Sequence, residues 1–102
     1  MAAATILFQR LALQEYRTAY HWYQQRSQQA AQDFRDEVDQ VLQRIADNPL
    51  QGTAYRRLFR WVRTRRFPYI LYYRLVVPDI VLIMAVAHVR RRPGYWLRRK
   101  GL

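Results

Sequence analysis

His88 and a group of arginines are the side chains of this 102-residue chain that could do chemistry. An imidazole changes its charge near neutral pH, so His88 could accept or donate a proton. Arg74 and Arg91 could hold phosphate oxygens through paired hydrogen bonds and stabilise a phosphorane. Tyr95 could be a second proton donor. These groups suit metal-independent RNA cleavage, in which one group activates the 2′-hydroxyl and another protonates the leaving oxygen.

Further basic and aromatic residues could bind nucleic acid or another target without reacting. Trp96 could stack on a base, or it could close one end of the core. Adjacent residues of a strand alternate faces, so at most one of Arg65 and Arg66 is expected to face a given site. The candidate binding cations are Arg65, Arg66, Arg90 and Arg92.

Each candidate also has a purely structural interpretation. His88 could be a hydrogen-bonded residue at the end of an apolar strand. Arg74 could pair with a helix acid such as Glu37 or Asp33. The arginines 90–92 could form a solvated basic patch. The sequence leaves both interpretations open.

The composition offers no other kind of catalytic site. Three glycines form no Gly-rich phosphate loop, and the absence of cysteine excludes a thiol nucleophile, a thiolate metal site and a disulfide framework. The two histidines are 67 positions apart and the acids are scattered, which is not a metal-ligand pattern. Ser27, the single serine, lies in no nucleophile elbow. We therefore expect no metal and no cofactor.

Hydrophobic periodicity predicts the elements that must position these side chains. Thr5–Phe8 is a short apolar run that suits an edge strand. A period of three to four residues predicts a helix from about Leu11 to Arg26. Ser27 can cap a second helix, which extends to about Asp47. Because the connection is short, the two helices are expected to form an antiparallel hairpin.

The second half of the chain is predicted to form strands. Alternating or continuous apolar runs occupy residues 59–64, 69–76 and 80–87, and Pro78–Asp79 forms a turn. A basic tail, residues 89–102, forms a last turn or a short helix. The predicted fold is a single α+β domain over residues 1–102, with the order β-α-α-β-β-β. An N-terminal strand and the helical hairpin precede a three-stranded antiparallel sheet.

The charge is divided unequally along the chain. Residues 1–51 carry five Arg and six acids, whereas residues 52–102 carry twelve Arg and Lys100 against Asp79 alone. This asymmetry indicates a polyanionic or acidic protein partner. No apolar run approaches the roughly 20 residues of a membrane span, and no basic region precedes the first apolar residues as in a secretory signal. We expect a cytoplasmic protein that does not bind a membrane.

The order and spacing of several motifs resemble the ParE/RelE superfamily, the toxins of bacterial type II toxin–antitoxin systems, which include plasmid stabilisation proteins. The resemblance extends over nearly the whole chain. It rests on Trp22–Tyr23; on Phe34, Glu37, Val38, Leu42 and Ile45 with Asn48–Pro49; on residues 65–69 and Tyr72–Tyr73–Arg74; and on Ala87–His88, Arg91, Pro93 and Tyr95–Trp96.

This resemblance implies an antitoxin partner that neutralises the toxin in a hetero-oligomer. ParE-like members inhibit DNA gyrase by binding it, whereas RelE-like members cleave mRNA in the ribosome. The helical hairpin and the Tyr72–Tyr73–Arg74 strand favour the gyrase-binding class. The alternative is a ribosome-dependent nuclease that uses His88 and the arginines, and a third possibility is a non-toxic basic protein that binds nucleic acid.

Overall fold

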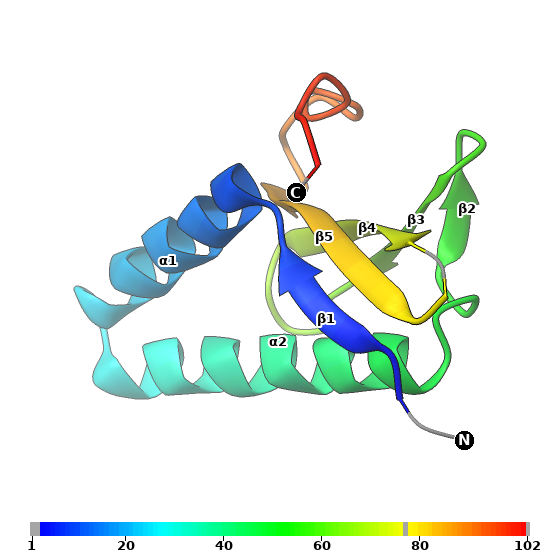
Figure 1. Cartoon of the computed structure of the whole chain (residues 1–102). Coiled ribbons are helices and arrows are strands. Elements are labelled where there is room, and N and C mark those ends of the chain that lie inside the picture. The colour runs from blue at the N-terminus through cyan, green and yellow to red at the C-terminus, as the bar shows by residue number, and fades with distance from the viewer. Residues whose placement is uncertain (1–2, 77, 102) are drawn as a thin grey trace.

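The computed structural model describes residues 3–76 and 78–101. Two helices and five strands are arranged as shown in Figure 1. In chain order they are β1 (Thr5–Phe8), α1 (Arg10–Gln24), α2 (Gln28–Asp47), β2 (Thr53–Tyr55), β3 (Phe59–Arg63), β4 (Tyr69–Val76) and β5 (Ile80–His88). No helix in these ranges is long and apolar enough to cross a membrane.

The five strands form one mixed sheet in the order β1-β5-β4-β3-β2. The α+β class is confirmed, but the predicted three-stranded antiparallel sheet is wrong in detail. β1 joins the same sheet as the parallel partner of β5, with the helices and the other strands between them in the sequence. The short strand β2 adds an antiparallel edge beside β3, and its three residues are too few for a hydrophobic pattern to predict.

Both helices begin at side-chain caps. The side chain of Gln9 accepts hydrogen bonds from the backbone N–H groups of Leu11 and Ala12, and α1 follows. Ser27 Oγ accepts the N–H of Ala30 at 3.1 Å, which confirms it as the cap of α2. The predicted helix boundaries therefore hold to within two residues.

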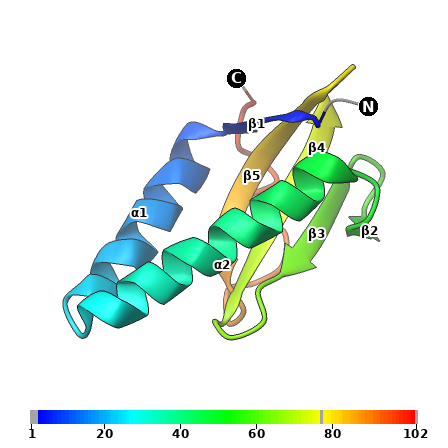
Figure 2. The ribbon, with the colours of Figure 1, turned by 90° about the horizontal axis from the view of Figure 1, so that it is seen from below.

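The helices cover one face of the sheet, as Figure 2 shows. We call the apolar layer between them the helix-side core. Its fully buried members include Phe34, Val38, Val41 and Ile45 of α2, and Leu71, Tyr73, Val81 and Ile83 of the sheet. The apolar residues of α2 recur every three or four positions, so all of them reach the same strands.

The opposite face of the sheet is covered by the C-terminal segment, residues 89–101. Here Trp96, which is fully buried, lies against the rings of Phe59 and Tyr72, each with its centroid 4.8 Å away. We call this layer the tail-side core. The segment forms successive turns and not a short helix, with bonds such as that from the Leu97 N–H to the Gly94 carbonyl. β5 is therefore buried on both faces, as its continuous apolar sequence requires.

A β-bulge interrupts β5 at Met84. Tyr72 pairs with Ala85 and Tyr73 pairs with Ile83, which leaves Met84 without a partner in β4. Ile83 and Val86 both belong to the helix-side core, although residues on one face of a regular strand are separated by an even number of positions. After the bulge, each side chain of β5 therefore faces the side of the sheet opposite to the one that unbroken alternation would give it.

Tyr73 links the sheet to the loop after α2. Its hydroxyl donates to the carbonyl of Pro49 at 2.7 Å and accepts the N–H of Gly52 at 3.1 Å, and the side chain is fully buried.

We expect Tyr73→Phe to lower the free energy of unfolding by about 1–3 kcal/mol, because the Pro49 carbonyl and the Gly52 N–H lose their partner. Urea unfolding measures this. Tyr20→Phe, at a half-buried tyrosine, is the control and should change it by less than about 0.5 kcal/mol; equal effects would contradict the assignment.

Candidate functional site

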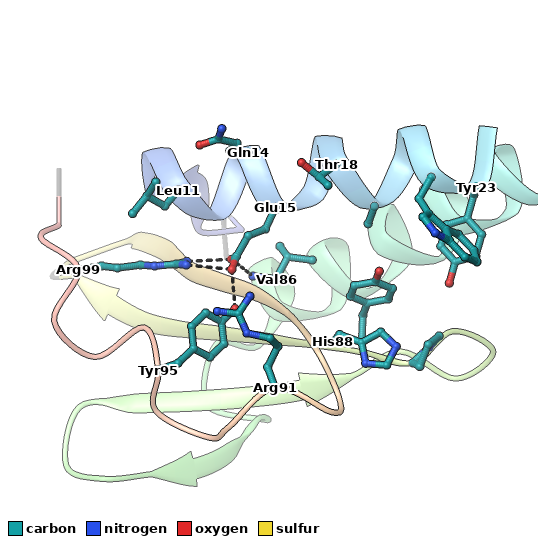
Figure 3. A pocket seen from close by; sticks show the side chains of 14 residues that line it. Leu11, Gln14, Glu15, Thr18, Tyr23, Val86, His88, Arg91, Tyr95 and Arg99 are labelled. Atoms are coloured by element: carbon teal, nitrogen blue, oxygen red, sulfur yellow. Dashed lines mark hydrogen bonds and ion pairs between the residues drawn. The ribbon is translucent and has the colours of Figure 1, made fainter. Parts of the chain in front are cut away.

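A groove of about 640 Å³ lies between α1 and the C-terminal segment. α1 forms one wall, and the end of β5 with the turns that follow forms the other, as Figure 3 shows. Its apolar surface comes from Leu11, Ala19, Trp22, Tyr23, Pro68, Tyr69 and Val86. Its polar side chains are Gln14, Glu15, Thr18, His88, Arg91, Tyr95 and Arg99.

The Glu15 carboxylate is the centre of the polar part of the groove. Arg99 donates to both of its oxygens, at 2.8 and 2.9 Å, and the Tyr95 hydroxyl donates to one of them. The backbone N–H of Val86 donates to Oε1 at 3.0 Å. The side chains of Glu15 and Arg99 are only 18% and 13% exposed, so this is a bidentate ion pair largely removed from water.

The early end of β1 explains why this carboxylate is needed. β1 ends at Phe8, opposite Ile83, so the edge of β5 beyond that point has no strand beside it. After the bulge, the Val86 N–H and the Met84 carbonyl point to this open edge. Glu15 accepts the first and Arg99 donates to the second at 3.2 Å. The ion pair thus replaces the missing strand and satisfies buried backbone groups.

Tyr95 keeps its proton in this setting. Burial, reinforced by the hydrogen bond to Glu15, raises the pKa of Tyr95 far above its ordinary value of 10.0. The guanidinium of Arg91 lies 3.8 Å from the centroid of its ring. The hydroxyl that the sequence suggested as a proton donor is therefore already committed to Glu15.

His88 lies at the end of the groove nearest the loop between β3 and β4. Its ring meets the ring of Tyr69 edge to face, with centroids 5.4 Å apart. Its Nδ1 accepts the backbone N–H of Arg90 at 3.0 Å, so Nε2 carries the proton of the neutral ring. His88 remains half-exposed to the groove.

The structure brings together three of the predicted catalytic residues and separates the fourth. His88, Arg91 and Tyr95 line one groove. Arg74 pairs with Leu82, which belongs to the tail-side core, whereas His88 pairs with Tyr69, which packs on the helix-side core. Because cross-strand partners share a face, Arg74 and His88 lie on opposite faces of the sheet. The expectation that Arg74 would act beside His88 is wrong.

Burial and pairing decide two points that the sequence left open. Trp96 is fully buried in the tail-side core, so it presents no face on which a base could stack. Glu37 pairs with Arg66 and not with Arg74, with Arg66 Nε 3.2 Å from a carboxylate oxygen. The four candidate binding cations are all exposed: Arg65, Arg66, Arg90 and Arg92.

Sequence reasoning missed Glu15 and Arg99. A signal for Glu15 was present, because it follows Ala12 by three residues and precedes Ala19 by four, and both alanines are buried. An acid on the buried stripe of a helix needs a partner. Nothing in the sequence indicates that the partner is Arg99, which is 84 residues away. In the described ranges no three His, Asp or Glu side chains gather where a metal ion could bind.

Comparison with protein families identifies the chain. The model of the ParE toxin of the type II toxin–antitoxin system parDE matches residues 6–93. The chain belongs to this family. The resemblance inferred from the sequence motifs is therefore confirmed, while no curated protein matches the chain significantly. The match with the ParE family covers Glu15, His88 and Arg91 of the groove and ends before Tyr95 and Arg99.

We expect Glu15→Gln to lower the free energy of unfolding by about 2–4 kcal/mol, because the largely buried Arg99 loses its counter-charge. Urea unfolding at neutral pH measures this. Asp39→Asn, at an exposed acid of α2, is the matched control and should have an effect below about 0.5 kcal/mol. An unfolding midpoint of Glu15→Gln equal to that of the unsubstituted chain would show that the ion pair contributes nothing.

Tyr95 also predicts how stability depends on pH. Its pKa is raised in the folded state, so the folded chain binds its proton more tightly than the unfolded chain does. The contribution is complete below the unfolded pKa of about 10 and is lost as the pH rises above it. In Tyr95→Phe the loss of stability from about pH 9 to about pH 11 should be shallower. Equal slopes of unfolding free energy against pH in the two proteins would contradict this. Both proteins share the contribution of the other tyrosines whose pKa is raised, which are Tyr16, Tyr23, Tyr69, Tyr72 and Tyr73.

Proposed function

We propose that this chain inhibits DNA gyrase by binding to it and that the groove between α1 and the C-terminal segment is the contact surface. As a ParE-family toxin, the chain is the toxin component of a type II toxin–antitoxin system and has an antitoxin partner. Inhibition by binding requires an exposed surface that can be buried against a protein. It requires no catalytic group.

The observation that carries the proposal is the separation of Arg74 from His88. Metal-independent RNA cleavage needs cations beside the acid–base groups to stabilise the phosphorane. Arg74 lies on the other face of the sheet, and the Tyr95 hydroxyl is held by Glu15. Of the four groups suggested for the nuclease mechanism, Arg74 is therefore absent from the groove, and Tyr95 lies in it with its hydroxyl bonded to Glu15.

The side chains that remain in the groove are those that dominate protein interfaces. Trp22 is 49% exposed although it is large and apolar. Beside it lie Tyr23 and Tyr69, and Arg91 stacks on Tyr95. Tryptophan, tyrosine and arginine are the residue types most often found at binding hot spots.

One observation favours the nuclease alternative. His88 and Arg91 line the same groove, and the ring of His88 is half-exposed there. An imidazole and a guanidinium could still act on a phosphodiester, although without the help of Arg74. This alternative predicts that His88 is indispensable for toxicity.

The test is inhibition of supercoiling of a relaxed plasmid by purified gyrase. We expect the chain to inhibit. His88→Ala removes one half-exposed side chain of the groove and should weaken inhibition by no more than about threefold, because inhibition by binding needs no acid–base group. Trp22→Ala should weaken inhibition by about tenfold or more, since it removes the largest exposed apolar side chain of the groove. Leu58→Ala is the control, because Leu58 is 62% exposed and lies before β3, outside the groove.

The same variants separate the two mechanisms in cells. Induced expression without antitoxin should lower thymidine incorporation before amino-acid incorporation. If protein synthesis stops first, and if His88→Ala removes that effect, the gyrase proposal is wrong and the nuclease alternative holds. Equal inhibition by Trp22→Ala and Leu58→Ala would exclude the groove as the contact surface.

A further inference from the structure

Six exposed arginines lie at one end of the sheet. They come from two segments that are far apart in the sequence, the end of β3 with the loop that follows it and the turn after β5. We call them the arginine rim: Arg63, Arg65, Arg66, Arg90, Arg91 and Arg92. Only Arg91 also belongs to the groove.

Backbone contacts bring the two segments together. Tyr69 at the start of β4 pairs with His88 at the end of β5, and Arg63 pairs with Ile70. The N–H of Val89 donates to the carbonyl of Pro68 at 2.9 Å. The residues that carry the rim therefore lie side by side at the same end of the sheet.

The loop between β3 and β4 is also anchored to α2. The carboxylate of Glu37, whose side chain is 7% exposed, accepts the backbone N–H of Arg66 at 2.9 Å. This bond fixes the base of the loop, while the side chains of Arg65 and Arg66 remain exposed to solvent. The backbone that carries Arg65 and Arg66 is thus held in place by α2, while their side chains remain open to a ligand.

The rim has little negative charge to balance it. Within residues 3–76 and 78–101, Glu37 is the only carboxylate that forms an ion pair with a rim arginine. Six cations with one paired anion produce a strong positive field at this end of the molecule. A ligand with closely spaced negative charges is the natural complement.

The positions of the exposed apolar residues favour a nucleic acid over a protein as the ligand of the rim. A stable protein interface has an apolar centre. The large exposed apolar side chains of the described residues are Trp22, Leu50, Leu58 and Leu75, and all lie outside the two rim segments. Trp22 belongs to the groove, which shares only Arg91 with the rim. The rim consists of charges without such a centre, which matches a phosphate backbone better than a protein surface.

The positions of the aromatic residues favour a duplex over a single strand as the ligand of the rim. Binding of single strands relies on exposed aromatic rings on which bases stack. Trp96 is buried, and the exposed Trp22 belongs to α1 and not to the rim segments. A duplex, by contrast, offers a continuous row of phosphates and needs no stacking surface.

We propose that the arginine rim binds the phosphate backbone of duplex DNA without regard to sequence. Apart from the shared Arg91, this surface is separate from the protein-binding groove, so the inference goes beyond the gyrase proposal and does not depend on it. It assigns Arg65, Arg90 and Arg92 a DNA-binding role. A toxin with both surfaces would contact a DNA-bound protein and its DNA together.

The test measures binding of the full chain to a fluorescent random-sequence duplex of about 30 base pairs over a series of salt concentrations. We expect the logarithm of the binding constant to fall with the logarithm of salt concentration with a slope between about −3 and −5. The triple variant Arg65→Gln/Arg90→Gln/Arg92→Gln should make this slope less steep by roughly 0.9 for each phosphate that the variant no longer neutralises. Its affinity at low salt should fall by about tenfold or more.

The matched control is Arg10→Gln/Arg17→Gln/Arg57→Gln, which removes the same charge at exposed positions outside the rim. It should bind DNA within about twofold of the unsubstituted chain. Equal weakening by both triple variants would mean that net charge alone causes binding, and the proposal would be overturned. Tighter binding to a single strand of the same length would also overturn it.

Supercoiling assays on the same preparations keep the two proposals apart. If the chain inhibits gyrase but neither it nor the control variant binds the duplex, the DNA-binding inference fails and the gyrase proposal stands. If the rim binds the duplex but gyrase is not inhibited, the gyrase proposal fails and the DNA-binding inference stands. Urea unfolding of both triple variants shows whether weaker binding reflects a failure to fold.

Discussion

The Glu15 carboxylate joins three parts of the fold at one point. It accepts hydrogen bonds from the edge of β5, from Tyr95 and from Arg99, so one side chain connects α1, the sheet and the C-terminal segment. The segment in turn covers the second face of the sheet with Trp96. A carboxylate removed from water is stable only when its hydrogen-bonding capacity is filled, and here an arginine, a hydroxyl and a backbone N–H fill it.

The carboxylate has a role because β1 ends at Phe8 and leaves the edge of β5 open, whereas the bulge at Met84 decides which side chains share a surface. With unbroken alternation, His88 would lie on the face of Leu82 and therefore of Arg74. The extra residue reverses the alternation and places His88 against Tyr69 on the helix side. One residue in one strand thus separates the imidazole of His88 from the Arg74 guanidinium that could have held a phosphate beside it.

The molecule presents two surfaces of different chemistry. The groove combines exposed Trp22 with tyrosines and Arg91, which suits a protein. The arginine rim is charged and lacks an apolar centre, which suits phosphates. They meet at Arg91, which belongs to both. The ParE-family match ends at residue 93, so the family pattern includes the rim and one wall of the groove but not the Tyr95 and Arg99 that complete the Glu15 site.

Local sequence determined most of the elements and their bounds, because caps and hydrophobic periodicity act over a few residues. Ser27 caps α2, and residues 69–76 form β4 as predicted. The family could also be inferred, since its motifs are local. The tertiary structure alone decided the parallel pairing of β1 with β5, the burial of Trp96 and the ion pair of Glu15 with Arg99. The strand pairing and the ion pair join residues 75 or more positions apart, beyond the reach of local patterns. The uniformly apolar sequence of β5 also does not indicate the bulge that separates His88 from Arg74.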